Sequence, residues 1–205
     1  LRLDVSFDLW YGESDADPFI PELIDILTEK GLLHESEGAM VVDVQEEGDK
    51  ITVPPIIVTK SNKSVGYDAT DIATIIQRQR DFQPARIWYV VDKRQSLHFT
   101  QVFRCAKKAG LVPAETELKL LGFGTMNGSD GKPFKTRDGG VMRLSDLIQT
   151  AIDGAMEKLA DSEYVQSGKL EAAEKIGMAA IKFGDLSNQP SKDYIFDLNK
   201  FLAFD

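Results

Sequence analysis

The strongest constraint on the fold is a short apolar run, residues 86–91, that stands between two segments of helical periodicity. A compact apolar run in this setting is typical of a strand covered on both faces, which favours a parallel sheet. Another apolar run, residues 118–123, follows the second helix, and residues 3–10 form an earlier β-prone run. This alternation of strands and helices predicts an α/β fold with a doubly wound sheet and right-handed crossovers. The helices are predicted from the apolar positions Ile72, Ile75 and Ile76, starting near Thr70 or Asp71, and Val102, Phe103 and Ala106, ending at Gly110.

Two further regions surround this alternation. Ile20, Leu23, Ile24 and Leu27 share one helical face, and Gly31 is a suitable C-cap. Two β-like runs, 39–44 and 51–60, flank a turn at 46–49 and predict an inserted antiparallel hairpin. From Leu144 the chain is predicted to be helical, with helices over 144–159 and about 170–185.

Composition excludes several classes of protein. With 42% hydrophobic residues in 205, the chain is globular rather than disordered. The single cysteine, Cys105, allows no internal disulfide or cysteine cluster and is expected in the core. A net charge of −9 disfavours a nonspecific nucleic-acid coat protein, although a local basic loop remains compatible with it. Without a long apolar span or a signal pattern, we expect a cytoplasmic protein with no membrane partner.

Polar side chains follow the predicted strands, where ligands bind in doubly wound sheets. Glu13 follows the first strand, and Asp92 and Gln95 follow the strand at 86–91. Tyr67 and Asp71 are four residues apart, so in a helical turn they face the same side. Such carboxylates, phenol and amide offer mainly hydrogen-bond acceptors, which suit a guanidinium. The alternative is structural: turn surface for Glu13, an N-cap for Asp71, packing for Tyr67 and a loop position for Gln95.

His98 stands at a predicted helix start. A histidine there is more often a structural donor, but free N–H groups at a helix start also suit phosphate. Only His34 accompanies it, so no multi-histidine metal site is expected.

A glycine-rich segment, residues 128–140, carries Lys132, Lys135 and Arg137. Flexible backbone beside clustered cations suits closure over phosphates. The segment lacks the Walker pattern, and a solvated surface turn is the alternative.

Several of these motifs resemble one family. The runs at 12–14, 67–73, 91–99, 131–140 and 193–197 are similar, in this order, to arginyl-tRNA synthetase of the bacterial type. The resemblance covers nearly the whole chain and implies a class I synthetase that joins L-arginine to tRNA through an adenylate, using ATP and magnesium. It implies a fold that is the second half of a class I nucleotide-binding domain, with a monomer expected at full length.

The resemblance also implies roles for individual residues. Glu13, Tyr67, Asp71 and Gln95 correspond to arginine-binding positions, with Gln95 at the amino-acid end. His98, Gly124, Met126 and Phe134 correspond to ATP-binding positions. Lys132 and Lys135 correspond to the catalytic KMSKS loop, which here reads Lys-Pro-Phe-Lys-Thr-Arg.

The chain departs from the family pattern in one major respect. The HIGH motif and its strand-helix unit are absent from these 205 residues. We therefore expect a catalytic core over 1–16 and 61–140, an insertion over 17–60 and a helical segment over 141–205. The isolated chain is expected to be an inactive fragment of a longer enzyme.

Two other functions remain as alternatives. A related nucleotidyltransferase could use the same sheet for another small substrate, and preference for arginine over lysine or citrulline would distinguish it. A noncatalytic synthetase-like module is the second alternative, and the intact mass of the natural product would distinguish that one.

Overall fold

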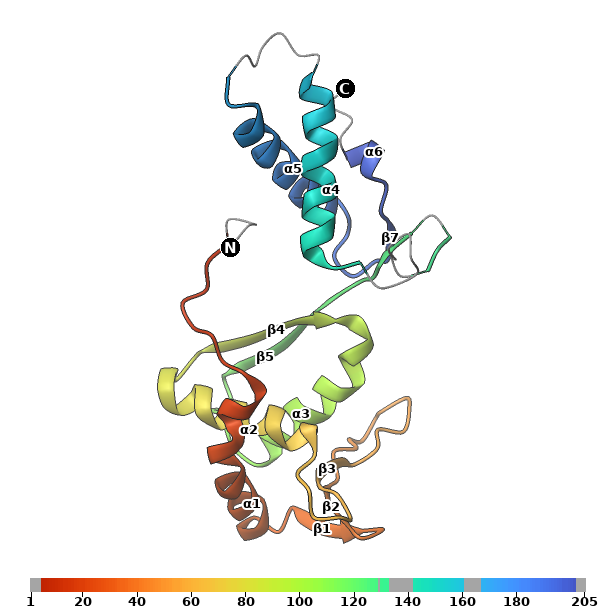
Figure 1. The fold of residues 1–205 in the computed structure, drawn as a ribbon. Coiled ribbons are helices and arrows are strands. Elements are labelled where there is room, and N and C mark those ends of the chain that lie inside the picture. Colours follow the sequence, from red (N-terminus) through yellow and green to blue (C-terminus); the bar gives the residue numbers. More distant parts are fainter. Residues whose placement is uncertain (1–4, 129, 133–141, 161–166, 202–205) are drawn as a thin grey trace. The chain divides into compact units, whose positions relative to one another are not determined.

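The computed structural model describes residues 5–128, 130–132, 142–160 and 167–201. The chain divides into two compact units, Ser6–Gly122 and a second unit that comprises Leu1–Val5 and Phe123–Asp205. Helices and strands are mixed in an α/β arrangement with small sheets (Figure 1). No helix in the described part of the chain has the length and apolar character needed to cross a bilayer.

The first unit contains an antiparallel sheet, a second two-stranded sheet and three α-helices. Its elements in chain order are η1 (Glu13–Phe19), α1 (Ile20–Glu29), β1 (Leu33–Ser36), β2 (Ala39–Val42), β3 (Ile56–Thr59), α2 (Tyr67–Phe82), β4 (Arg86–Asp92), η2 (Lys93–Gln95), α3 (Ser96–Lys108) and β5 (Glu117–Phe123). Leu23, Leu27, Ile72 and Ile75 are fully buried in its core. Cys105 is also fully buried, as predicted, and burial raises the pKa of its thiol to about 12.

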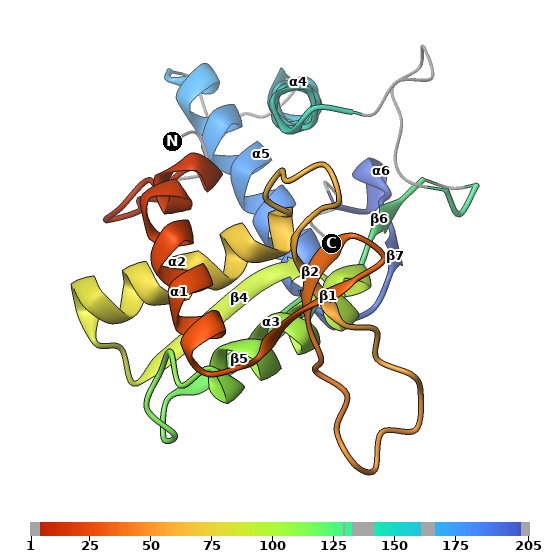
Figure 2. The same cartoon turned by 90° about the horizontal axis from the view of Figure 1, so that it is seen from below.

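Strands β4 and β5 are neighbours and run in the same direction, with α3 making the connection (Figure 1). Helices α2 and α3 lie against these strands in both views (Figure 1, Figure 2). Ile87 and Tyr89 of β4 are buried, whereas Trp88 and Val90 are 51% and 67% exposed. The prediction that this strand is covered on both faces is therefore wrong, because an uninterrupted apolar run does not reveal which face finds a partner.

The predicted first strand is also wrong over its described part. Residues 5–10 are not a strand, and Phe7 and Trp10 are exposed. A strand requires backbone partners on a neighbouring strand, and no described strand pairs with this segment. Glu13 consequently begins the helix η1 instead of ending a strand.

The inserted sheet has one more strand than predicted. Its order is β1-β2-β3, with the tight turn at Glu37 and Gly38, which both have positive φ. Strands β2 and β3 pair in antiparallel fashion as expected, but a long loop connects them instead of a hairpin at 46–49. The polar, mostly exposed strand β1 gave no apolar signal in the sequence.

The second unit is built on two long helices. Its elements are β6 (Met126–Asn127), α4 (Leu144–Ala160), α5 (Lys169–Leu186), β7 (Tyr194–Ile195) and α6 (Leu198–Phe201). Helices α4 and α5 follow the predicted ranges closely and pack together through Ala151, Ala155, Ala173 and Ala180. Strands β6 and β7 pair in parallel.

Candidate functional site

A cavity of about 320 Å³ in the first unit gathers the polar residues singled out in the sequence. Its lining residues come from the segment before η1, from η1 itself, from α2 and from η2. They are Tyr11, Gly12, Glu13, Tyr67, Thr70, Asp71, Thr74, Gln77, Arg78 and Gln95. The cavity thus brings together Glu13, Tyr67, Asp71 and Gln95, four positions that span 83 residues of sequence.

The start of helix α2 fixes Tyr67 and Asp71. Gly66 is the N-cap, and its N–H donates to the carbonyl oxygen of Val58 at 3.1 Å. A Cβ at this position would lie 2.8 Å from the carbonyl oxygen of Ile57, so the close approach requires glycine. The helix begins at Tyr67, three or four residues before the predicted start near Thr70 or Asp71, which places Asp71 one turn along the helix rather than at its N-cap. Tyr67 and Asp71 therefore face the same cavity, as their spacing predicted.

Glu13 reaches the cavity from η1. The N–H of Gly12 donates to the Asp15 carboxylate at 2.5 Å, which stabilises the first turn of η1. Helix η1 packs on α2 through the fully buried Ala16. This packing holds the Glu13 side of the cavity beside α2.

Gln95 is held by the short helix η2. The Asp92 carboxylate accepts from the backbone N–H of Arg94 at 2.8 Å and pairs with the Arg94 guanidinium at 2.6 Å. These hydrogen bonds lower the pKa of Asp92 to about 2. Asp92 is thus a capping residue, and Gln95 follows it at the end of η2.

His98 contacts Asp71, one of the residues that line the cavity. Its Nε2 is 2.6 Å from an Asp71 carboxylate oxygen, and its Nδ1 is 3.0 Å from an Asp68 oxygen. Burial opposes a charged ring, but the hydrogen bonds to Asp68 and Asp71 outweigh it and raise the pKa of His98 to about 9. His98 is therefore an imidazolium at neutral pH, in contact with a residue of the cavity.

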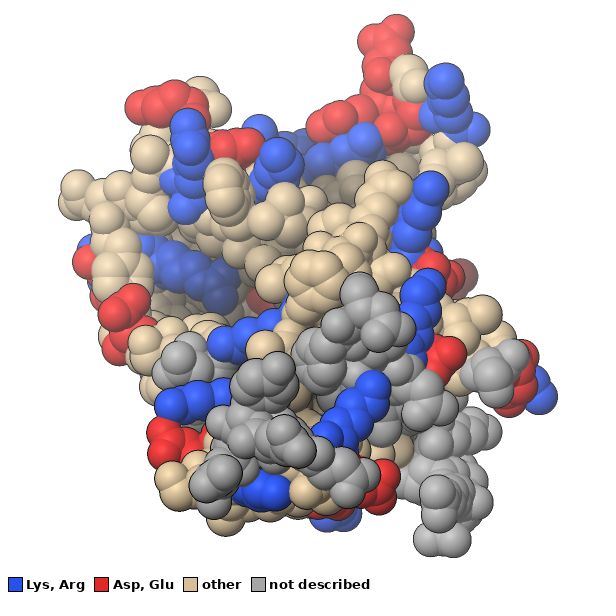
Figure 3. All heavy atoms as spheres, turned by 90° about the horizontal axis from the view of Figure 1, so that it is seen from above, with Lys and Arg blue, Asp and Glu red and all other residues tan. Residues whose placement is uncertain are grey.

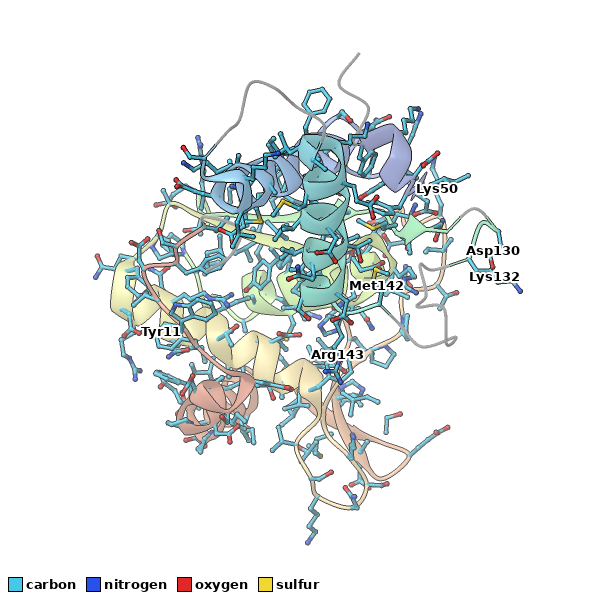
Figure 4. All side chains as sticks on the ribbon, turned by 45° about the horizontal axis from the view of Figure 1, so that its top comes forward. Tyr11, Lys50, Asp130, Lys132, Met142 and Arg143 are labelled. Atoms are coloured by element: carbon cyan, nitrogen blue, oxygen red, sulfur yellow. The ribbon has the colours of Figure 1, made fainter. Side chains whose placement is uncertain are left out.

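Sequence reasoning missed three residues here: Tyr11, Asp68 and Arg78. Tyr11 lies in the segment before η1 (Figure 4) and lines the cavity. Arg78 also lines it, and its guanidinium carbon lies 4.9 Å from the centre of the Tyr89 ring. The stripe Tyr67, Asp71, Thr74 and Arg78 has the spacing of one helix face, a signal that could have identified Arg78. No comparable signal marks Asp68.

The remaining candidate residues belong to the second unit or lie outside the described residues. The N–H of Gly124 donates to the carbonyl oxygen of Pro190, and a Cβ there would overlap the backbone of Lys192. Met126 pairs with Tyr194 in the β6–β7 ladder. The close approach of backbones explains the glycine and links this segment to the predicted motif at 193–197.

The cationic segment is described only at its beginning. Lys132 is exposed, and its backbone N–H donates to the Asp130 carboxylate at 3.0 Å in a turn closed by Gly128 (Figure 4). Phe134, Lys135 and Arg137 lie outside the described residues. Figure 3 shows Lys and Arg side chains interspersed with Asp and Glu side chains, in a chain whose net charge is −9.

Comparisons with known proteins agree with the motifs. The family model described as "tRNA synthetases class I (R), catalytic domain" matches residues 1–198. A curated arginine–tRNA ligase from Alkaliphilus oremlandii is 52% identical over 205 residues, and one from Agathobacter rectalis is 50% identical over 211. Both alignments cover the whole chain but only 35% of each relative, so the chain spans about a third of their length.

Solved structures give the same result. An arginyl-tRNA synthetase from Plasmodium falciparum superposes with a TM-score of 0.80 at 26% identity, covering 98% of this chain and 33% of that one. The enzyme from Thermus thermophilus has a TM-score of 0.79 at 19% identity, covering 99% of this chain and 40% of that one, and supports the fold alone.

Proposed function

Because the chain belongs to the catalytic-domain family of class I arginine-specific tRNA synthetases, we propose that it forms the arginine-binding part of an arginine–tRNA ligase. The observation that carries the proposal is the cavity on which Glu13, Tyr67, Asp71 and Gln95 converge. In the proposed complex Glu13, Tyr67 and Asp71 bind the guanidinium, and Gln95 contacts the amino-acid end of L-arginine.

The chemistry of the cavity supports this assignment. A guanidinium presents five N–H donors in one plane and pairs best with carboxylates. Glu13 and Asp71 supply two carboxylates, and the Tyr67 hydroxyl and the Gln95 amide can complete the set of polar contacts. Arg78, which also lines the cavity, is suited to the substrate carboxylate, because the two ends of arginine carry opposite charges.

We propose that ATP binds through His98, Gly124, Met126 and Phe134. Gly124 and Met126 are partly exposed and are suited to contact with an adenine, and Lys132 and Lys135 are suited to the phosphates of ATP. The arginine carboxylate would attack the α-phosphorus of ATP and release pyrophosphate. The tRNA hydroxyl would then attack the carbonyl of the adenylate, releasing AMP.

The protein's contribution to these steps is positioning and stabilisation of charge. In the proposed complex the cavity positions the guanidinium of L-arginine, and the two lysines oppose negative charge that develops on phosphate. No covalent intermediate with the protein is required. These roles assign Lys132 and Lys135 as the proposed catalytic residues.

Magnesium is proposed to accompany ATP. Among the described residues, no group of three or more His, Cys, Asp or Glu side chains is arranged to hold a metal ion. Magnesium in phosphate chemistry is held largely by phosphate oxygens and water, with few protein ligands. The described donor set therefore does not fit a resident metal centre, and none of the steps above passes through one.

The remaining features of the proposal follow from the family. The partner is tRNA, the compartment is the cytoplasm, and the full-length enzyme is a monomer. We retain a catalytic core over 1–16 and 61–140, an insertion over 17–60 and a helical segment over 141–205. A nucleotidyltransferase for another substrate and a noncatalytic module are not favoured by the relatives, which are named as arginine–tRNA ligases.

Calorimetric titration of the natural full-length protein tests the arginine cavity. We expect binding of L-arginine and much weaker binding of lysine and citrulline, since neither offers a charged planar fork. Asp71→Asn keeps the shape of the side chain but removes its charge, and should weaken arginine binding on the order of 100-fold. Asp25→Asn, on the exposed face of α1, is the control and should bind as the unmodified protein does. Equal affinity for arginine and citrulline would contradict the proposal.

A further inference from the structure

His98 is clamped between two carboxylates of the same helix. Asp68 and Asp71 are three residues apart on α2, and each approaches a different ring nitrogen, at 3.0 Å and 2.6 Å. The side chain of His98 is 10% exposed, that of Asp68 18% and that of Asp71 33%. Of the two carboxylates, only Asp71 lines the cavity. Asp68 is linked to Asp71 through the His98 ring. It also lies close to Tyr67, where burial and the Asp68 carboxylate raise the pKa of the phenol.

The geometry of the ring supports a fixed arrangement. The centre of the Tyr67 ring lies 4.7 Å from the centre of the His98 ring, with an angle of 30° between the two planes. The centre of the Phe99 ring lies 4.9 Å from the centre of the His98 ring in an edge-on arrangement. Both ring nitrogens are in hydrogen-bond contact with carboxylates, so the doubly protonated form satisfies both sites at once. The imidazolium thus fixes the orientation of Asp71, and Asp68 fixes the imidazolium through its other ring nitrogen.

The net charge of the His98 cluster depends on the second carboxylate, that of Asp68. An imidazolium paired with Asp71 alone would form a neutral pair and weaken the attraction of Asp71 for a cation. With Asp68 included, the three side chains carry one net negative charge. The charge of Asp71 is then available to a guanidinium even though Asp71 is hydrogen-bonded to a cation.

We propose that Asp68 is a positioning residue that acts through His98, keeping Asp71 both aligned and electrostatically effective for the guanidinium of the substrate. This inference rests on the proposed arginine site. It assigns to Asp68 a part in substrate binding without direct contact with the substrate.

The groups that face His98 define its titration. Helix α2 supplies Asp68, Asp71 and the phenol of Tyr67, and strand β3, which also packs on α3, has no ionisable side chain in its sequence. Glu13 and Arg78 line the same cavity as Asp71, and Lys93 and Arg94 belong to η2, which packs on α3. The pKa of His98 near 9 agrees with an imidazolium that two carboxylates stabilise against burial.

The test compares Asp68→Asn with the unmodified full-length protein in calorimetric titrations of L-arginine between pH 6 and 8.5. The amide that replaces the Asp68 carboxylate can donate to a neutral ring, so the pKa of His98 should fall. The unmodified protein should show nearly constant affinity over this range. Asp68→Asn should bind arginine about tenfold more weakly at pH 6 and recover as His98 loses its proton.

A second variant separates positioning from folding. His98→Gln keeps a donor for Asp71 without a titratable charge, so in titrations without ATP its affinity for L-arginine should stay within about threefold of that of the unmodified protein. In that background Asp68→Asn should have almost no further effect, and the histidine NMR titration of the single Asp68→Asn variant should show the lowered pKa. Asp25→Asn is again the control.

Three results would overturn the inference. One is an Asp68→Asn protein that binds arginine normally at every pH, and another is an equal loss at every pH, which would indicate a purely structural effect. A loss of the same size in the His98→Gln background would show that Asp68 does not act through His98. Absence of arginine binding in the unmodified protein would instead refute the proposed function, and the inference with it.

Discussion

The two principal helix pairs of the molecule are held together by different chemistry. Helices α4 and α5 meet through small apolar residues, and a Cβ on Gly177 would lie 2.8 Å from the backbone nitrogen of Ile152. Helices α2 and α3 share an aliphatic core, but one end of their contact carries Asp68, Asp71 and His98. Partly buried charges are costly unless paired, and an apolar contact would stabilise the helices equally well. This difference supports the proposal that the polar end of the α2–α3 contact serves binding, whereas the α4–α5 contact is structural.

The largest predicted effect is that of Gly177→Leu at the contact of α4 with α5. The new side chain would meet the backbone of α4, which cannot move aside without separating the helices, so we expect a loss of about 3 kcal/mol in the free energy of unfolding. Urea denaturation followed by circular dichroism measures it. Ala179→Leu adds a similar side chain on the exposed face of α5 and should be nearly neutral. A neutral Gly177→Leu would show that α4 and α5 do not pack closely.

A substitution at Gly66, the N-cap of α2, tests how firmly the polar end of the α2–α3 contact is held in place. Gly66→Ala would bring a methyl group within 2.8 Å of the Ile57 carbonyl oxygen and force α2 away from β3. We expect a loss of about 1–2 kcal/mol in the free energy of unfolding. Gly12→Ala is a stability control, because its Cβ would meet nothing closer than 3.7 Å. Equal stability of the two variants would contradict the close approach at Gly66.

The contact of His98 with Asp68 and Asp71 should also make the free energy of unfolding depend on pH. The pKa of His98 rises from 6.5 to about 9 on folding, so the folded protein binds a proton that the unfolded chain releases. This stabilisation is complete below pH 6.5 and is lost as pH rises through 9. Urea denaturation at about pH 6.5, 8 and 9.5 should show the decline, which His98→Gln removes and His34→Gln, on the exposed strand β1, retains. The same slope in His98→Gln would assign it to other groups.

The smallest effect is expected at an exposed ion pair. Lys175 and Glu171 lie 2.6 Å apart on α5, but both side chains are more than two-thirds exposed. Water and salt screen such pairs, so Lys175→Gln should leave the free energy of unfolding unchanged within the precision of urea denaturation. A clear loss in the free energy of unfolding would mean that exposed ion pairs in this protein stabilise the fold more nearly as the buried ones do.

The sequence was informative wherever the signal was local. Helical periodicity gave the ranges of α1, α4 and α5 to within a few residues, and the spacing of Tyr67 and Asp71 put both on one face of α2. It failed for residues 5–10 and for β1, because β-structure depends on a partner strand and not on the run itself. The exposed Trp88 and Val90 illustrate the same limit.

Motifs and periodicity within single elements were enough to predict the family, the main helices and four of the ten residues that line the cavity. No motif indicates that His98 lies between Asp68 and Asp71, 27 residues away from the latter, and this arrangement is visible in the folded chain alone. That contact depends on how α3 packs against α2. Packing between distant segments sets the distances between charges, and those distances decide which of the polar residues act together.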